Sequence, residues 1–109
     1  MDFLKELGVN EFNQGACFGL NEWSKTQDKG ILESYNPANG ELIGSVYGAS
    51  EEDYERMMST AQEVFEEWRQ VPAPQRGEAV RLCTEALRRN KDALGSLVAL
   101  EMGKIKAEG

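Results

Sequence analysis

The chain of 109 residues contains no histidine. Histidine is the side chain whose charge changes near neutral pH, and it is the commonest metal ligand in proteins. Its absence excludes triads of serine, histidine and aspartate, histidine-based acid–base catalysis and most zinc sites. Glycine-rich phosphate-binding patterns and carboxylates paired across a turn are also missing. The residues by themselves therefore predict no metal site and no common catalytic motif.

Cysteines are few and long apolar runs are absent. Cys17 and Cys83 lie far apart without metal-ligand spacing, so we expect two reduced thiols in a cytoplasmic protein. No apolar stretch approaches the ~20 residues that span a bilayer. Residues 1–4 lack the basic start and long apolar middle of a signal peptide. No membrane association is expected.

Basic residues are outnumbered, with 12 Lys and Arg against 19 Asp and Glu and a net charge of -7. Such a chain repels phosphates, which disfavours nucleic acids and anionic membrane surfaces as partners. A content of 40% hydrophobic and 28% charged residues is typical of a folded globular protein. A chain of this length forms at most one domain, and folding would bury about two-thirds of its unfolded surface.

Residues 1–30 are predicted to form an N-terminal strap. Phe3, Leu4 and Leu7 have helical spacing and Gly8 can end the turn, which favours a short helix. The segment that follows, up to residue 30, is irregular. Its lone aromatic residues are expected to pin the strap onto a neighbouring surface. They are Phe12, Phe18 and Trp23.

The segment of residues 31–47 has the pattern of a β-hairpin. Two short apolar and β-branched runs flank the phrase NPANG at residues 36–40. Pro37 fixes a turn value of φ, and Asn39 and Gly40 tolerate positive φ. A lone hairpin is marginally stable in water, so we expect it to pack against another element.

Three amphipathic helices are predicted after the hairpin, at about 50–69, 75–89 and 91–102. Ser50 is the expected N-cap of the first helix, and acidic residues fill its first turn. One apolar stripe runs along that helix, as expected of core residues rather than cofactor contacts. The stripe consists of Tyr54, Met57, Met58, Ala61, Val64, Phe65 and Trp68.

The prolines at 72 and 74 end the first helix. The second helix is expected to bury its own apolar face, made of Ala79, Val80, Leu82, Cys83, Ala86 and Leu87. In the third helix Gly95 costs about 1 kcal/mol relative to alanine, which predicts close packing there. Gly103 is the expected C-cap. The chain is thus predicted to be an α+β protein, mainly α.

Four phrases in order resemble the N-terminal part of an aldehyde dehydrogenase. They are YNPANGE at 35–41, Trp68, PAPQRG at 72–77 and LEMGK at 100–104. The sequences at 4–8, 72–78 and 94–98 are similar to those of the antiquitin branch, which consists of the α-aminoadipic semialdehyde dehydrogenases. The resemblance implies a parent α/β enzyme with a Rossmann-like cofactor domain. That oxidoreductase would convert an aldehyde substrate to a carboxylate with NAD or NADP, by cysteine-based covalent catalysis.

Under this resemblance residues 31–109 are the incomplete N-terminal part of the cofactor-binding domain. The family's nucleophile stands in a Gly-Gln-x-Cys phrase, which neither Cys17 nor Cys83 matches. Glu101 and Lys104 match a family phrase, but as a helix end with its cap. We therefore expect no catalytic, cofactor-binding or metal residue here, no bound cofactor, and no activity of this chain alone.

An alternative is a free-standing small helical interaction module, whose working surface would be an exposed apolar stripe. On either hypothesis, helices shaped to cover a larger sheet would keep apolar faces without a cover. We therefore expect self-association through these faces or through the hairpin edges.

Overall fold

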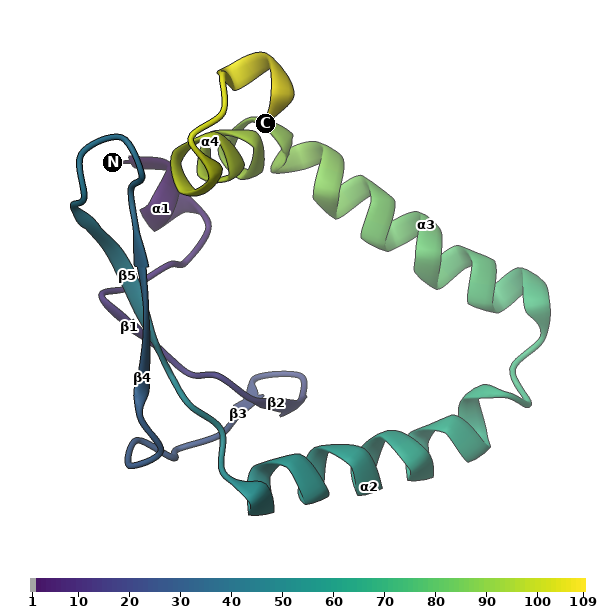
Figure 1. Cartoon of the computed structure of the whole chain (residues 1–109). Coiled ribbons are helices and arrows are strands. Elements are labelled where there is room, and N and C mark those ends of the chain that lie inside the picture. The colour runs from purple at the N-terminus through teal and green to yellow at the C-terminus, as the bar shows by residue number, and fades with distance from the viewer. Residues whose placement is uncertain (1) are drawn as a thin grey trace.

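The structure, a computed structural model, describes residues 2–109 and arranges them as an open frame (Figure 1). The hairpin of β4 and β5 forms one side, and α2, α3 and α4 follow one another around the rest. The described chain measures 49 × 36 × 18 Å. The elements are α1 (Asp2–Glu6), β1 (Phe12–Asn13), β2 (Cys17–Gly19), β3 (Glu22–Trp23), β4 (Ile31–Tyr35), β5 (Leu42–Tyr47), α2 (Glu51–Trp68), α3 (Ala73–Arg89), α4 (Lys91–Met102) and the 3₁₀ turn η1 (Lys106–Glu108).

The mixed, mainly helical fold, the hairpin and the three long helices are confirmed. Ser50 caps α2, and Gly103 ends α4 in the left-handed conformation at φ 68°. The helix α3 begins at Ala73, two residues earlier than predicted, because Pro74 fits the first turn of a helix, where its missing N–H is not needed. Gly95 is buried, and the backbone of Gly109 would lie 3.0 Å from a Cβ there, so the predicted close packing is confirmed.

The strap contains three short strands that the sequence pattern did not indicate. β1 pairs in parallel with β5, which gives a sheet in the order β1-β5-β4, and β2 pairs with β3. Phe12 stacks on Tyr47 with ring centroids 5.5 Å apart, and the Arg56 guanidinium lies 4.0 Å over the Phe18 ring. Two aromatic residues thus pin the strap, as predicted. Trp23 is 54% exposed and lines a pocket with Leu7 and Phe12, and its role stays a prediction.

The cap of α2 also fastens the strap to the helix. The backbone N–H of Asp53 donates to Ser50 Oγ, and that of Ser50 donates to Asp53 Oδ2, each at 3.0 Å. The buried Ser24 hydroxyl donates to the same carboxylate at 2.9 Å. The hydrogen bond from the Ser50 backbone lowers the pKa of Asp53 to about 2, with further bonds from the Thr26 and Ser24 side chains lowering it and partial desolvation opposing them.

This carboxylate makes the strap contact dependent on acid pH. Because the folded pKa of Asp53 lies below its ordinary value of 3.8, its stabilising effect is complete above that value and is lost as the pH falls through about 2. We expect the Asp53 carboxyl carbon to titrate near pH 2 in an NMR experiment. Ser24→Ala should raise that midpoint, and a midpoint at the ordinary value in both proteins would contradict the contact.

Very little of the chain is buried. Among residues 2–109, Ala16 and Ala93 are the only hydrophobic residues that are buried, and the buried polar ones are Ser24 and Ser45. The accessible surface is 8446 Å². A compact protein of this mass exposes about 6,000 Å². The radius of gyration is 16.9 Å, against about 13 Å for a compact domain of this length.

The core predicted for the apolar stripes is therefore wrong for this chain. Phe65 and Trp68 of α2 are 49% and 42% exposed, and Val80 and Leu87 of α3 are 64% and 61% exposed. The reason is that α2 and α3 lie along different sides of a frame one layer thick (Figure 1), whereas a domain core forms between two packed layers. Folding buries about half of the unfolded surface rather than the expected two-thirds.

Candidate functional site

Side chains of the types that bind metals are not grouped in the described chain. Within residues 2–109 no three His, Cys, Asp or Glu side chains lie close enough together to hold a metal ion. The Cys17 thiol is exposed and donates to the carbonyl oxygen of Gly19 at 3.1 Å. Cys83, expected to be packed, is exposed because the apolar face of α3 is uncovered. That neither cysteine is a nucleophile remains a prediction.

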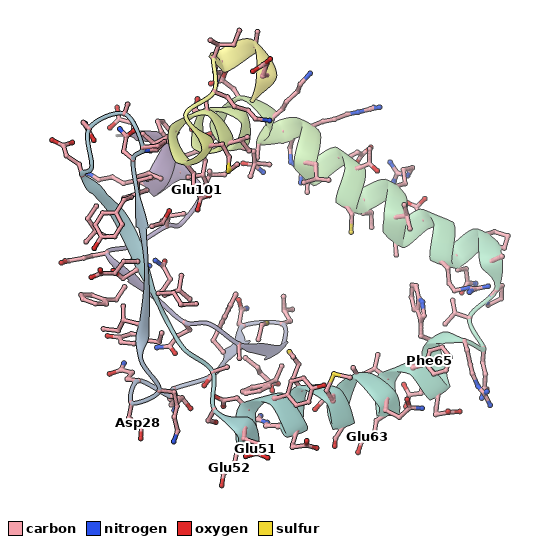
Figure 2. The ribbon with its side chains drawn as sticks, in the orientation of Figure 1. Asp28, Glu51, Glu52, Glu63, Phe65 and Glu101 are labelled. Atoms are coloured by element: carbon pink, nitrogen blue, oxygen red, sulfur yellow. The ribbon has the colours of Figure 1, made fainter. Side chains whose placement is uncertain are left out.

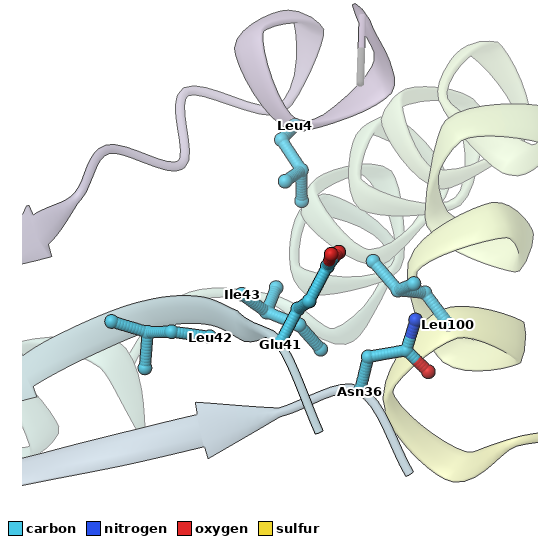
Figure 3. Close-up of a pocket in the computed structure, with 6 residues that line it drawn as sticks. All are labelled: Leu4, Asn36, Glu41, Leu42, Ile43 and Leu100. Carbon is cyan, nitrogen blue, oxygen red and sulfur yellow. The ribbon is translucent and has the colours of Figure 1, made fainter. Parts of the chain in front are cut away.

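A small cavity lies where α1, the hairpin turn and α4 meet (Figure 3). Its volume is about 220 Å³. Apart from the polar Asn36 and Glu41, its lining is aliphatic and consists of Leu4, Leu42, Ile43 and Leu100. The Asn36 side chain accepts from the backbone N–H of Ala38 at 2.9 Å. The cavity thus belongs to a packed junction with few polar groups free for a ligand.

The two phrases richest in family resemblance meet at this junction, although far apart in sequence. The Ser34 hydroxyl, at the end of β4, donates to Glu101 Oε1 at 2.8 Å, and Figure 2 shows Glu101 where α4 approaches the hairpin. A Cβ at Gly103 would lie 3.0 Å from Pro37 Cγ. The turn of the hairpin is therefore seated against the C-terminal end of α4.

Each residue of the turn has a structural task. The backbone N–H of Asn36 donates to the carbonyl oxygen of Glu41 at 2.8 Å, and that of Glu41 donates to Asn39 Oδ1 at 2.9 Å. Gly40 takes the positive φ of 76°, so Asn39 contributes its side chain rather than a left-handed backbone. Glu101 is likewise engaged by Ser34. That the matched Glu101 is structural stays a prediction.

A second candidate site is the pair of apolar faces on α2 and α3, called here the uncovered stripes. Figure 2 shows Glu52 and Glu63 pointing away from the frame, with Phe65 on the side of α2 that faces the enclosed space. All members of the stripes are more than 40% exposed. The α2 stripe consists of Tyr54, Met58, Phe65 and Trp68, and the α3 stripe of Val80, Leu82 and Leu87. Exposed apolar side chains aligned along a helix in this way are typical of an interaction surface.

The strap clamp at Ser24 and Asp53 was missed by the sequence analysis. Only the capping box beside it had a signal, because serine followed three residues later by an acid is the pattern of such a box. The pattern predicts that Ser50 and Asp53 bind each other. It contains no information on Ser24, which folding brings in from 29 residues away.

Comparison with known proteins identifies the family. The sequence profile of the Aldehyde dehydrogenase family matches residues 23–109. Alpha-aminoadipic semialdehyde dehydrogenase of Bos taurus is 47% identical over 98% of the chain, which corresponds to 19% of that protein. Aldehyde dehydrogenase family 7 member A1 of Pisum sativum is 45% identical over 100% of the chain and 21% of that protein. Family 7 member B4 of Arabidopsis thaliana is 42% identical over 99% of the chain and 21% of that protein.

The chain thus spans about a fifth of the length of these curated relatives. Their names are those of the antiquitin branch, so this part of the predicted resemblance is confirmed. No helix in the described part of the chain combines the length and the hydropathy needed to cross a membrane. With most of its residues matched by the family profile, the chain belongs to the aldehyde dehydrogenase family.

Proposed function

We propose that this chain is the structural N-terminal part of an NAD(P)-dependent aldehyde dehydrogenase and is inactive alone. The observation that carries the proposal is the junction of the hairpin turn with α4. There the family phrases use their polar side chains to hold a turn and a helix end. The bovine relative's name makes α-aminoadipic semialdehyde the first substrate to test for the whole protein.

The starts of α2 and α3 do not fit a nicotinamide dinucleotide. Such cofactors place their pyrophosphate on the N-terminus of a helix, where free N–H groups meet the anion. The first turn of α2 instead carries Glu51, Glu52 and Asp53, and its N–H groups are used by its own capping box. The first turn of α3 contains Pro74, which has no N–H. In the proposed enzyme the cofactor would take hydride from the substrate, and the residues of this chain would contribute packing alone.

We also propose that residues 31–109 form an incomplete part of a Rossmann-like cofactor domain and that residues 1–30 form the strap. A cytoplasmic location is proposed because both cysteines are free thiols, which that compartment keeps reduced. The isolated chain is proposed to self-associate through the uncovered stripes, because water contact with them is unfavourable.

Titration of the isolated chain with NAD and NADP tests its inactivity. The expected result is no saturable binding by calorimetry and no aldehyde-dependent formation of NADH, because the starts of α2 and α3 offer no anion site. The full-length bovine relative serves as the positive control. Saturable binding of NAD or NADP in the micromolar range, or oxidation of an aldehyde by the chain alone, would contradict the proposal.

The alternative, a free-standing interaction module, is favoured by one observation, the exposure of the uncovered stripes. The coding sequence beyond codon 109 separates the two hypotheses. A reading frame that continues into a Gly-Gln-x-Cys phrase supports the enzyme. A stop codon after codon 109 in the messenger RNA supports the module.

A further inference from the structure

We propose that Asn39, in the hairpin turn, is a site of self-modification, at which the backbone nitrogen of Gly40 attacks the side-chain amide and releases ammonia. Water then opens the cyclic imide to give aspartate or isoaspartate. The contact of the turn with α4 controls how often this reaction occurs. The reaction uses only groups of the turn and water, so it does not depend on the proposed function.

The residues around Asn39 leave its amide open to attack. Among the asparagines of the chain, Asn39 alone precedes a glycine. Nothing lies within 4 Å of the position that a Cβ would take at Gly40, so no side chain obstructs the approach of its nitrogen. Both residues are exposed, and water can reach an imide formed there. Asn36, at the start of the same turn, precedes Pro37, whose nitrogen carries no hydrogen and cannot form the imide.

Two hydrogen bonds of the turn act on the reacting groups in opposite directions. The backbone N–H of Glu41 donates to Asn39 Oδ1 at 2.9 Å, which draws electrons from the amide carbon and favours attack on it. The backbone N–H of Gly40 donates to the carbonyl oxygen of Asn36 at 2.8 Å. The nitrogen of Gly40 must leave this second bond and lose its proton before it can form a bond to Asn39 Cγ. The closed turn is therefore protected, and the reaction requires the turn to open.

Opening of the turn is restrained by the junction with α4. The Ser34 hydroxyl donates to Glu101 Oε1 at 2.8 Å, next to the turn, and Pro37 lies against Gly103. These contacts lower the population of an open turn, because local opening must break them. A reaction of a transiently opened segment follows the population of that open form. The rate at which Asn39 loses ammonia therefore depends on how firmly the turn is held.

The steps balance without an oxidant or a metal. The new bond joins the nitrogen of Gly40 to Asn39 Cγ, and the bond from Cγ to Nδ2 breaks as ammonia leaves. Water then cleaves one of the two carbon–nitrogen bonds of the imide. Cleavage at Cγ gives aspartate, and cleavage at the main-chain carbonyl carbon gives isoaspartate, whose backbone runs through the former side chain.

The two products should affect the turn differently. Within residues 2–109, Asn39 is engaged through Oδ1, and its Nδ2 donates no hydrogen bond. An aspartate therefore keeps the bond from the Glu41 N–H. An isoaspartate adds a methylene group to the backbone of a turn that is closed by the bond from the Asn36 N–H to the Glu41 carbonyl oxygen. The isoaspartate form should therefore loosen the junction irreversibly.

Incubation of the folded chain at neutral pH, beside a synthetic peptide of residues 34–42, tests the proposal. The products at Asn39 are separated by chromatography and identified by mass spectrometry. We expect Asn39 to react more slowly in the folded chain than in the peptide, and faster than the other asparagines of the chain. Ser34→Ala should speed the reaction in the folded chain by roughly two- to tenfold, the factor that corresponds to one hydrogen bond. Gly103→Ala should also speed it, because the added Cβ displaces Pro37.

Gly77→Ala, which lies within α3, is the matched control and should leave the rate at Asn39 unchanged. Equal rates in the folded chain and the peptide, or unchanged rates in both Ser34→Ala and Gly103→Ala, would overturn control by the junction. A slower reaction in Gly77→Ala would also overturn it, because unfolding of the whole chain would then expose the site. If Asn39 stays intact in every folded protein while the peptide reacts completely, the site itself is wrong.

Urea unfolding of the products tests the predicted loosening. The variant Asn39→Asp should unfold at nearly the same urea concentration as the unaltered chain. The purified isoaspartate form should unfold at a lower concentration. Equal midpoints for the isoaspartate form and the unaltered chain would contradict the loosening of the junction.

Discussion

Replacing Phe65 and Leu82 together by aspartate is expected to convert the isolated chain from an associated species into a monomer of 12.1 kDa. Both residues belong to the uncovered stripes and are about half exposed, at 49% and 53%, so neither supports a core within the chain. Burying a carboxylate in an apolar contact without a partner is strongly unfavourable. Sedimentation velocity over a range of protein concentrations measures the change.

A charge-matched variant separates this effect from general repulsion. Ser59→Asp with Arg88→Gln changes the net charge by the same two units at exposed positions of α2 and α3 that are outside the uncovered stripes. This pair is expected to leave the associated species in place. If both pairs dissociate the chain equally, or if the unaltered chain is already monomeric at high concentration, association through the stripes is wrong.

The helices and the hairpin could be predicted because their signals are local. Ser50 and Asp53 start α2 through bonds between neighbours in sequence, and Gly103 ends α4 because it takes a positive φ at little cost. Gly40 does the same in the hairpin turn. These hydrogen bonds and backbone preferences depend on residues a few positions apart. They can therefore be recognised in the sequence whatever the segment packs against.

Burial could not be predicted in the same way. Helical periodicity shows which face of α2 is apolar, but it contains no information on whether the same chain supplies the cover. The apolar stripe from Tyr54 to Trp68 was therefore predicted to be part of a core, whereas the structure leaves it exposed. The strap strands were missed for a related reason. β1 and β3 have two residues each. The pairing of β1 depends on where β5 lies, and β3 pairs with the equally short β2.

The junction shows what a family phrase can and cannot indicate. Sequence comparison finds YNPANGE and LEMGK, and local rules explain each as a turn and a helix end. Their contact through Pro37 and Gly103 comes from the fold, as does the hydrogen bond to Glu101 from Ser34, the residue just before the first phrase. The two phrases are thus two halves of one structural contact.

Gly103→Ala is expected to destabilise the chain by about 2 kcal/mol. An alanine at a left-handed position costs about 1–2 kcal/mol. The added Cβ would also lie 3.0 Å from Pro37 Cγ, a ring atom held by the hairpin turn, so one of the two phrases must shift. Urea unfolding followed by far-UV circular dichroism measures the loss of stability. Because association changes the apparent stability, the proteins are compared at one concentration or in the monomeric variant with Phe65→Asp and Leu82→Asp.

Gly77→Ala is the matched control and should have the opposite sign. Gly77 lies within α3, and nothing is found within 4 Å of the Cβ that alanine would add. In a helix the change from glycine to alanine stabilises by about 0.5–1 kcal/mol, because alanine loses less backbone freedom on folding. The same chemical change thus gives opposite effects at the two glycines. Two shifts of the same sign would contradict the left-handed helix end at Gly103, the residue that faces Pro37 at the junction.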